Sequence, residues 1–325
     1  MHHPGTKNMN YLVDIVMMVY NHEEYIAEAI ESVICQETNF KYRLIIGEDC
    51  SKDKSREIIA RYATANPDKI LPVYRETNIG SQKNSALLLS TCTAKYIALC
   101  EGDDHWIDKH KLQKQVDFLE TNPDFTMCFT DVQIVDEMGW NKPKEEYYPV
   151  IENDILTIDD FILSYKSVIP TPTILFRNIL PRPLPDFFMK TVSGDICVHL
   201  LIADKGKTKY LPDVTAVYRN HAGGITKTDD VIARAYDMRI DTYEDANEYF
   251  GYRYNDQFRK QLLIMIKVRM IFGSKGLSFF PKLKNFRRNF GKYLKYSDKV
   301  NLKEIIYYIA ILFFPKLLRA VGKPR

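Results

Sequence analysis

Long apolar runs are absent from this sequence of 325 residues. A helix that spans a membrane needs about 20 consecutive apolar residues, and no stretch of the chain reaches that length. The first residues, Met1 to Gly5, also lack the apolar segment that marks a secretory signal peptide. These absences argue against an integral membrane protein, and they predict a protein located in the cytoplasm.

Paired cysteine motifs are also absent. The six cysteines form no C-x-x-C pair and show none of the spacings that are typical of zinc sites. Several of them lie in apolar segments, so we expect buried free thiols in a reducing compartment. The cysteine spacing therefore argues against a disulfide framework and against a cysteine-rich metal module. The sequence also contains no serine nucleophile elbow and no internal repeat.

Acidic residues are scarce in the last part of the chain. From Gly251 onward there are 18 Lys and Arg against 3 Asp and Glu, whereas the first 250 residues contain 27 and 39. The net charge of +3 therefore conceals an acidic body and a basic tail. Such a tail suits an anionic partner, either membrane lipid or nucleic acid.

Predicted strands and helices alternate through the first 130 residues. Short apolar runs indicate the strands, and apolar residues spaced three to four positions apart indicate the helices between them. The predicted strands are residues 12–19, 42–47, 70–74, 96–100 and 125–130; the predicted helices are residues 23–34, a segment ending near 65, 81–90 and 109–120. This alternation predicts an α/β fold with a mostly parallel central sheet flanked by helices.

The pattern is less regular after residue 130. Residues 135–149 are polar and aromatic, which is typical of a loop. The segments that follow are predicted as a strand at 171–177, a helix at 196–203, short strands at 209–211 and 214–218, a loop at 219–224, and helices at 229–249 and 258–272. We expect one large α/β domain, residues 1–225, and a helical, basic C-terminal extension, residues 226–325.

Three carboxylates follow the predicted strand at residues 96–100. Glu101, Asp103 and Asp104 lie on the turn that leads toward the next helix. Open α/β sheets bind ligands at the carboxyl ends of their strands. Acidic side chains this close together repel one another unless a cation lies among them, and Mg²⁺ binds one or two carboxylates together with phosphate oxygens. A solvated acidic turn is the simpler alternative, but this position favours a metal and phosphate site.

With these elements placed, the chain resembles the family 2 glycosyltransferases, which have the GT-A fold. The similarity extends to about residue 225, and the order and spacing of its segments are more specific than any one segment. The matching segments are Val19-Tyr20-Asn21, Tyr25-Ile26, Ala29–Val33, Glu48–Asp53, Asn78-Ile79-Gly80, Glu101–Asp104 and Asp195. The chain departs from the family pattern at Glu101, where Asp is usual, at Cys50, where Gly is common, and at Lys83-Asn84.

The resemblance implies a metal-dependent inverting glycosyltransferase of the hexosyl- or N-acetylhexosaminyltransferase class. Its donor would be a nucleotide-sugar, and the resemblance favours a UDP-sugar. Its acceptor would be a hydroxyl of a glycan or a lipid-linked molecule in surface polysaccharide assembly. The implied cofactor is Mn²⁺ or Mg²⁺, bound to the diphosphate of the donor.

The resemblance also implies a role for each matched residue. Asp103 would ligate the metal, and Glu101 and Asp104 would position the ribose, the metal or its waters. Asp195 would be the catalytic base, although it could instead cap the helix that it precedes. Asp49 would contact the base of the nucleotide, and Tyr20 would line the base. The other implied donor contacts are Asn21, Glu48, Lys83, Arg219 and His221.

Two other functions remain open from the residues alone. A nucleotidyltransferase also combines an α/β sheet with a metal and a nucleotide, but it favours a glycine-rich phosphate loop near the N-terminus. Residues 19–24 contain no glycine and two acids, which weighs against it. A nucleic-acid-binding protein would need aromatic and basic residues interleaved on a recognised module. We find no such module, so we expect no nucleic acid partner.

The basic tail contains an amphipathic segment. Six Lys and Arg lie between Lys282 and Lys295, and an apolar stripe runs beside them if the segment is helical: Leu283, Phe286, Phe290 and Leu294. Residues 305–314 are apolar, but Pro315 and Lys316 end this run short of a membrane span. We expect peripheral contact with the inner face of the cell membrane. The alternative is that these helices pack within the protein.

Overall fold

Strand β1, Val13–Val19, lies inside the sheet in this computed structural model of the protein. It pairs in parallel with β2 (Tyr42–Glu48) on one side and with β4 (Tyr96–Leu99) on the other. Nearly every residue of β1 is buried. A strand covered on both faces must be apolar at consecutive positions, which explains why the sequence of β1 reads as a continuous apolar run.

The structure describes residues 10–164, 167–191, 193–221, 229–272, 279–297 and 302–313. Two compact units divide the chain, Met1–Gly224 and Ile225–Arg325. Three segments that the sequence analysis singled out lie outside the described residues: Met1–Gly5, Ala222–Gly224 and Phe314–Lys316.

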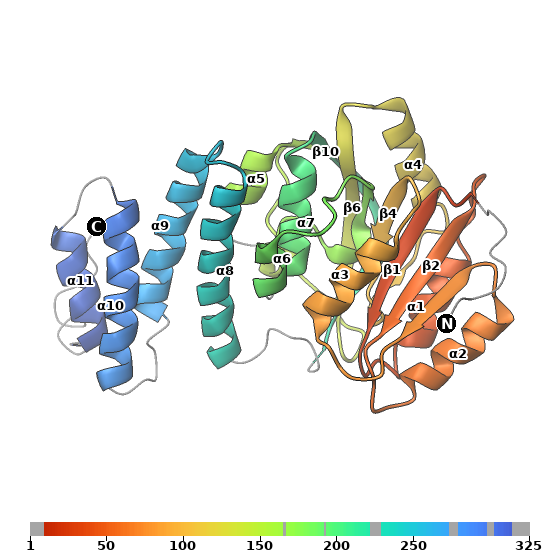
Figure 1. The fold of residues 1–325 in the computed structure, drawn as a ribbon, viewed down its shortest axis with the longest axis horizontal. Helices are drawn as coiled ribbons and strands as arrows, with labels where there is room; N and C mark the ends of the chain where they lie inside the picture. The colour runs from red at the N-terminus through yellow and green to blue at the C-terminus, as the bar shows by residue number, and fades with distance from the viewer. Residues whose placement is uncertain are drawn as a thin grey trace. The chain divides into compact units, whose positions relative to one another are not determined.

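The first unit contains a sheet and its flanking helices (Figure 1). Its other elements are α1 (Ile26–Ile34), α2 (Ser55–Ala65), β3 (Ile70–Tyr74), α3 (Ser81–Thr91), β5 (His105–Trp106), α4 (Lys111–Thr121), β6 (Phe125–Asp136), β7 (Asn141–Lys142), η1 (Lys144–Glu146), β8 (Ile155–Leu156), α5 (Ile158–Leu163), η2 (Thr171–Thr173), β9 (Ile174–Arg177), α6 (Asp186–Lys190), α7 (Gly194–Ala203) and β10 (Lys207–Asn220).

The strand order confirms a mostly parallel sheet: β3-β2-β1-β4-β9-β6-β10-β5, with β7 paired to β6 and β8 to β10. Strands β3, β2, β1 and β4 run parallel, and β10 runs parallel to β6. Strand β9 is antiparallel to both β4 and β6, so it lies between two strands that are consecutive in the predicted alternation. The carboxyl ends of β1, β2 and β4 therefore lie along one edge of the sheet.

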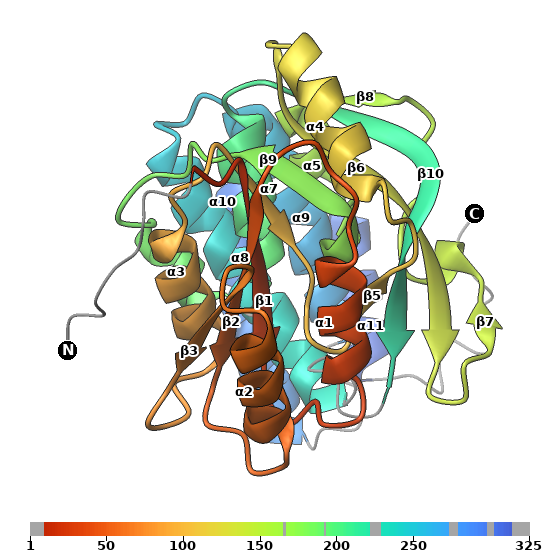
Figure 2. The same ribbon diagram turned by 90° about the vertical axis from the view of Figure 1, so that its right-hand side faces the viewer.

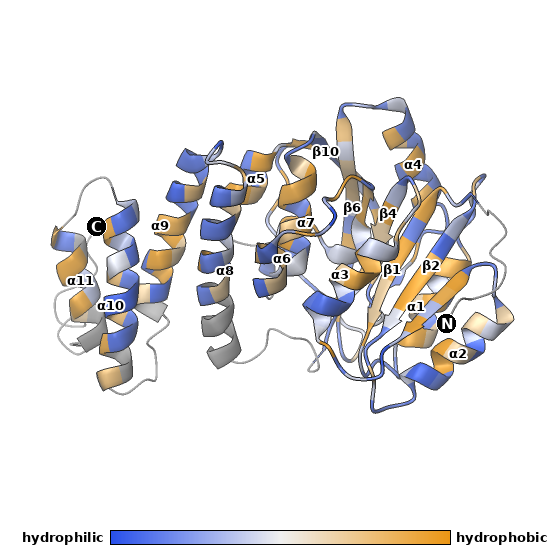
Figure 3. Ribbon diagram, in the orientation of Figure 1, coloured by the Kyte–Doolittle hydropathy of each residue, from blue (hydrophilic) through white to orange (hydrophobic). Residues whose placement is uncertain are grey.

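Helices cover both faces of this sheet. Alternate residues of β1 pack with α1, α2 and α4 in one apolar core, and α1 and α2 lie in front of the sheet in Figure 2. Helix α3 packs against β1 and β2 on the opposite face, and α7 packs against β6. Figure 3 shows β1 and α7 largely in the hydrophobic colour, as burial requires.

Several predicted boundaries were wrong, most clearly in the second half of this unit. The two short strands predicted at 209–211 and 214–218 are one strand, β10, whose pairing with β6 shifts register between Tyr210 and Val214. That irregularity includes Pro212, which cannot donate a hydrogen bond to a neighbouring strand and so reads as a break in the sequence. Strand β6 also continues six residues past the predicted end at 130, to Asp136.

The second unit consists of helices in the residues that the structure describes. They are α8 (Asp229–Tyr249), α9 (Asn255–Phe272), α10 (Phe279–Tyr296) and α11 (Leu302–Phe313). Helix α9 contacts α8, α10 and α11. Among the described residues, no helix has both the length and the apolar character that crossing a membrane requires.

Candidate active site

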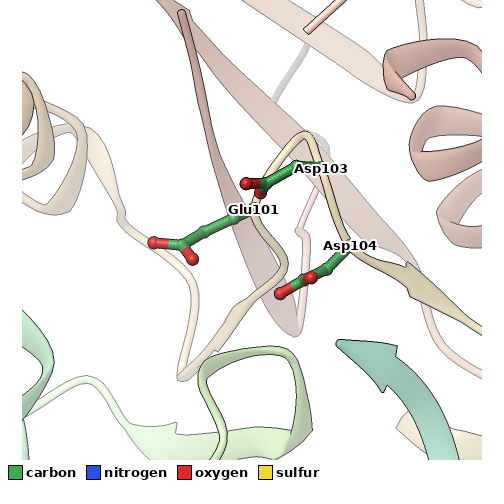
Figure 4. Close-up of side chains that lie close together, drawn as sticks. All are labelled: Glu101, Asp103 and Asp104. Atoms are coloured by element: carbon green, nitrogen blue, oxygen red, sulfur yellow. The ribbon is translucent and has the colours of Figure 1, made fainter. Parts of the chain in front are cut away.

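The turn after β4 brings three carboxylates together. One carboxylate oxygen from each of Glu101, Asp103 and Asp104 lies within 4.8 Å of the other two, and Figure 4 shows the three side chains branching from a single turn. Gly102 makes this turn possible, because a Cβ at that position would lie 2.8 Å from Val19 Cγ2 and 2.9 Å from His22 Nδ1. The acidic cluster predicted from the sequence is therefore present at the carboxyl end of a central strand.

Asp104 is held by the end of β10. Its Oδ1 accepts a hydrogen bond from the backbone N–H of Arg219 at 2.9 Å. Its Oδ2 is buried and has no hydrogen-bond partner among the described residues. Burial and the negative charges of Asp103 and Glu101 raise the pKa of Asp104 well above its ordinary value. A buried carboxylate oxygen without a partner is a ready ligand for a cation.

Asp103 lies between two histidines. Its Oδ2 is 3.0 Å from His221 Nε2, within hydrogen-bond distance, and 3.8 Å from His22 Nε2. Burial pushes the pKa of Asp103 upward, but the hydrogen bond from His221 and the charges of both histidines outweigh burial, so the pKa is lowered. Asp103 therefore stays ionised at neutral pH and available as a ligand.

Glu101 is linked electrostatically to Asp195. Burial, followed by the charges of Asp103 and Asp195, raises the pKa of Glu101 to about 8. Asp195 lies in the first turn of α7, and its Oδ2 accepts a hydrogen bond from Ser167 Oγ at 2.9 Å. The structure thus places the predicted base close enough to the acidic turn for the two carboxylates to influence each other.

A hard divalent cation fits this group of residues. The donor atoms are carboxylate oxygens, which Mg²⁺ and Mn²⁺ prefer. Oδ2 of Asp104 has no hydrogen-bond partner among the described residues, and burial together with the charges of Asp103 and Asp195 raises the pKa of Glu101, so bound positive charge would be favourable here. Glu101, Asp103 and Asp104 would hold the metal.

Arg219, near the end of β10, contacts the same turn. Its Nη1 donates a hydrogen bond to the carbonyl oxygen of Asp103 at 2.8 Å, and its Nη2 pairs with Glu28 of α1. The guanidinium also lies over the ring of Tyr25, 5.2 Å from the ring centre. Since these contacts occupy the guanidinium, Arg219 positions the acidic turn in this structure.

Two of the predicted donor residues, Glu48 and Asp49, lie at the end of β2, and their carboxylates accept hydrogen bonds from the protein itself. The Asp49 carboxylate accepts backbone N–H groups from Ile79 and Gly80, each at 2.9 Å. Glu48 is fully buried and accepts hydrogen bonds from Ser51 N and from Arg56 Nε, at 2.5 and 2.6 Å. These contacts fasten the loops around the sheet edge.

Three other predicted donor residues differ in their surroundings. Asn21 adopts a left-handed backbone conformation, with φ of 58°, and its Oδ1 accepts a hydrogen bond from Lys52 N at 2.8 Å. Tyr20 is 38% exposed at the end of β1, and Lys83 is exposed on α3. The ligand contacts predicted for these residues remain predictions.

Two tyrosines near the carboxylates were not predicted from the sequence. The rings of Tyr148 and Tyr218 meet edge to face, with centres 6.2 Å apart. Burial raises the pKa of both hydroxyls, and the charges of Asp104, Glu101 and Asp195 raise it further. Tyr148 lies in the polar segment 135–149, which has no periodicity to indicate where it folds, and Tyr218 ends the strand predicted at 214–218.

The chain is similar in sequence to a known protein family and to several known proteins. Residues 14–180 match the profile of Glycosyl transferase family 2. An uncharacterized protein of Mycobacterium tuberculosis is 37% identical over 214 residues, which cover 66% of this chain and 60% of that protein. The chain therefore spans about 60% of the length of that relative. The Bacillus subtilis protein TuaG, named as a teichuronic acid biosynthesis glycosyltransferase, is 31% identical over 213 residues, covering 65% of this chain and 80% of TuaG.

Solved structures share the fold at low sequence identity. S. aureus TarS 1–349, solved in complex with UDP-GlcNAc, has a TM-score of 0.52 at 15% identity, covering 87% of this chain and 91% of TarS 1–349. The mannosyltransferase PcManGT of Pyrobaculum calidifontis, solved with GDP-Man and Mn²⁺, has a TM-score of 0.51 at 13% identity, covering 95% and 87%. These likenesses concern the fold, whereas the profile match covers more than half of the chain. The chain belongs to glycosyl transferase family 2.

Proposed function

We propose that the protein is a metal-dependent inverting glycosyltransferase that moves a sugar from a UDP-sugar to a hydroxyl of a glycan or lipid-linked acceptor. The observation that carries this proposal is the carboxylate turn Glu101–Asp104 at the carboxyl end of β4, with Asp195 within electrostatic reach. This arrangement would provide a metal site for a diphosphate and a separate base for the acceptor, which are the two parts that such a transfer needs.

The donor class is supported by the relatives. TarS binds UDP-GlcNAc and PcManGT binds GDP-Man with Mn²⁺, so their shared fold accepts nucleotide-sugars with either base. The name of TuaG refers to teichuronic acid, which supports a role in surface polysaccharide assembly for this chain also. A hexose or N-acetylhexosamine is the sugar class that we propose.

The acidic turn would carry the donor side of the reaction. A divalent cation bound there would supply positive charge that offsets the negative charge of the departing nucleoside diphosphate. Glu101, Asp103 and Asp104 would hold that cation. The backbone N–H of Arg219 orients Asp104, and the imidazole of His221 orients Asp103, so both carboxylates are fixed before the donor binds.

Asp195 would carry the acceptor side. Its carboxylate takes the proton from the acceptor hydroxyl while that oxygen forms a bond to the anomeric carbon of the donor sugar. The bond from the anomeric carbon to the diphosphate oxygen breaks on the opposite face, so the configuration inverts and the nucleoside diphosphate leaves. Ser167 Oγ donates to Oδ2 of Asp195 and thereby fixes the orientation of the carboxylate.

The proposal is tested by measuring nucleoside diphosphate release from a panel of UDP- and GDP-sugars, with Mn²⁺ and with EDTA. Asp103→Asn should abolish release, because it removes a charged metal ligand. Asp195→Asn should leave donor affinity within a few-fold but lower turnover by about 10²–10⁴-fold, because it removes proton acceptance. Full activity in EDTA would contradict the metal-dependent part of the proposal.

Asp186→Asn provides a matched control for Asp195→Asn. Asp186 also lies in the first turn of a short helix, α6, and it is exposed. It should tolerate the substitution with turnover within about twofold. If Asp195→Asn instead weakens donor affinity and leaves turnover intact, Asp195 belongs to the donor site and the proposed base is wrong.

A further inference from the structure

On one face of helix α10, basic side chains form ion pairs with acidic side chains of α8. Arg288, Lys292 and Lys295 all point to carboxylates of α8. Arg288 Nη2 lies 3.4 Å from Asp241 Oδ2, Lys292 Nζ lies 2.7 Å from Asp241 Oδ1, and Lys295 Nζ lies 3.2 Å from Glu244 Oε1. Half of the six basic residues predicted to contact a membrane are therefore paired within the helical unit.

A second face of α10, next to the one with the ion pairs, exposes apolar and basic side chains. We call this face the α10 stripe, and it consists of Phe280, Leu283, Lys284, Arg287 and Leu294. These residues share one side of the helix because the last four lie three, four, seven and fourteen positions after Phe280. Phe280 is 79% exposed, and Leu283 and Leu294 are 38% and 45% exposed. The α10 stripe is thus an exposed row of apolar and basic side chains.

No described acidic side chain forms an ion pair with the charges on the α10 stripe. Lys284 and Arg287 are exposed and have no ion-pair partner among the residues that the structure describes. Helix α10 itself contains no Asp or Glu. The surrounding unit, residues 225–325, holds 21 Lys and Arg against 10 Asp and Glu, so its net charge is also positive.

The combination of exposed apolar and basic side chains on the α10 stripe favours an anionic bilayer as its partner. Apolar side chains that alternate with cations on one helix face can enter the boundary between lipid headgroups and acyl chains, while the long basic side chains reach the phosphates. A second copy of the stripe is a poor partner, because Lys284 and Arg287 of both copies would face each other without a carboxylate. Single-stranded nucleic acid would require rings for stacking, and the stripe contains one aromatic residue.

We propose that the α10 stripe docks the protein on the surface of an anionic bilayer, with the helix lying in the plane of the interface. Docking needs only the described surface of the second unit, so it is independent of the donor, the metal and the reaction. A lipid-linked acceptor would then be present at the same surface as the enzyme, but vesicle binding does not require that acceptor.

The test is flotation of the full chain with vesicles of phosphatidylcholine that contain about a quarter phosphatidylglycerol. The protein should float with these vesicles but not with pure phosphatidylcholine. Raising NaCl from about 0.1 to 0.5 M should release most of it, because salt screens the attraction between Lys284, Arg287 and the lipid phosphates. Lys284→Glu combined with Arg287→Glu should weaken binding at least about tenfold.

A second variant tests the apolar contribution. Phe280→Ser combined with Leu294→Ser should also weaken flotation about tenfold, and a thermal melt checks that each variant remains folded. Met138→Ser combined with Trp140→Ser is the matched apolar control, because these residues are 80% and 70% exposed on the turn between β6 and β7 of the first unit. Arg61→Glu combined with Lys207→Glu is the matched charge control, since both residues are exposed on the first unit.

Both controls should float like the parent protein. The proposal is overturned if the parent protein does not float with anionic vesicles, or if the controls lose binding as strongly as the stripe variants. It is also overturned if the parent binds RNA but not vesicles over the same salt range, because the basic surface would then serve nucleic acid.

Discussion

His221 Nε2 lies 3.0 Å from Asp103 Oδ2, and this contact joins the end of β10 to the turn after β4 across 118 positions of sequence. The imidazole is buried and also packs against the ring of Tyr25, with ring centres 5.0 Å apart. Two sides of the imidazole are therefore fixed, one by a carboxylate and one by an aromatic ring. This contact ties the orientation of the proposed metal ligand to the last residues of the sheet.

Replacing His221 should lower the rate of transfer more than the stability of the fold. His221→Ala removes the hydrogen bond that orients Asp103, so we expect kcat/KM to fall by about 10- to 100-fold. The matched control is His110→Ala, because His110 is about half exposed just before α4. Initial rates with a saturating metal concentration measure both variants. Equal rates for the two variants would show that the contact does not affect the reaction.

Gly102→Ala should displace the whole acidic turn. The new Cβ would lie 2.8 Å from Val19 Cγ2, and valine on a buried strand cannot move away easily. We expect the free energy of unfolding to fall by about 1–3 kcal/mol and metal-dependent donor binding to weaken. Chemical denaturation and donor titration with Mn²⁺ measure the two effects.

Gly291→Ala is the control for that substitution. Gly291 lies inside α10, and a Cβ built there meets no atom within 4 Å. Alanine should stabilise this exposed helix position by about 0.5–1 kcal/mol, because glycine loses more conformational entropy in a helix. If both glycine variants change stability in the same direction, close approach at Gly102 is not the reason for its glycine.

Cys50 occupies a backbone conformation that favours glycine. Its φ is 58°, in the left-handed region where a side chain is strained. Cys50→Gly should raise the free energy of unfolding by up to about 1 kcal/mol, the relief of strain being partly offset by the greater entropy of glycine in the unfolded chain. Cys35→Gly, at a residue with φ of −84°, should give no such gain. Urea denaturation of both variants tests this. A lower free energy of unfolding for Cys50→Gly than for the parent protein would contradict the claim that Cys50 is strained.

The local elements were predictable from the sequence because their signals are local. The strand–helix alternation through residue 130 and the acidic turn after β4 were confirmed, since both depend on short-range periodicity and on the general behaviour of sheet edges. The position of β9 between β4 and β6 was not predictable. Which strand lies between two others depends on pairing over long sequence separation, and apolar content does not encode it.

The contacts that complete the site were missed for the same reason. His22 and Glu28 lie near the start of the chain but contact Asp103 and Arg219, far away in sequence. In the tail, the sequence showed six basic residues but not that three of them face carboxylates of α8. Charge counts locate a basic segment, whereas the tertiary pairing decides which of its charges remain exposed.

Lys111 is a buried lysine that should make stability depend on pH. Its side chain is fully buried in α4, where Nζ donates to Gln115 Oε1 at 2.6 Å and lies 4.4 Å from the centre of the Trp106 ring. Burial lowers the pKa of Lys111 to about 7 in the folded protein. The same group in the unfolded chain has a pKa of about 10.4.

The direction of the effect follows from these two values. Between about pH 7 and pH 10 the unfolded chain holds a proton on Lys111 that the folded protein has released, so unfolding takes up a proton. A higher pH therefore favours the folded state in this window. We expect the contribution of Lys111 to the free energy of unfolding to rise by about 1 kcal/mol per pH unit between pH 7 and 9.

Comparison with Lys111→Met isolates this contribution, because methionine fills a similar volume and does not titrate. Urea denaturation at pH 7, 8 and 9 should show the parent protein gaining stability relative to Lys111→Met at each step. Lys109→Met is the matched control, since Lys109 is exposed only two residues away and should show no such rise. If the parent and Lys111→Met keep a constant difference across this range, Lys111 is not a buried group with a lowered pKa.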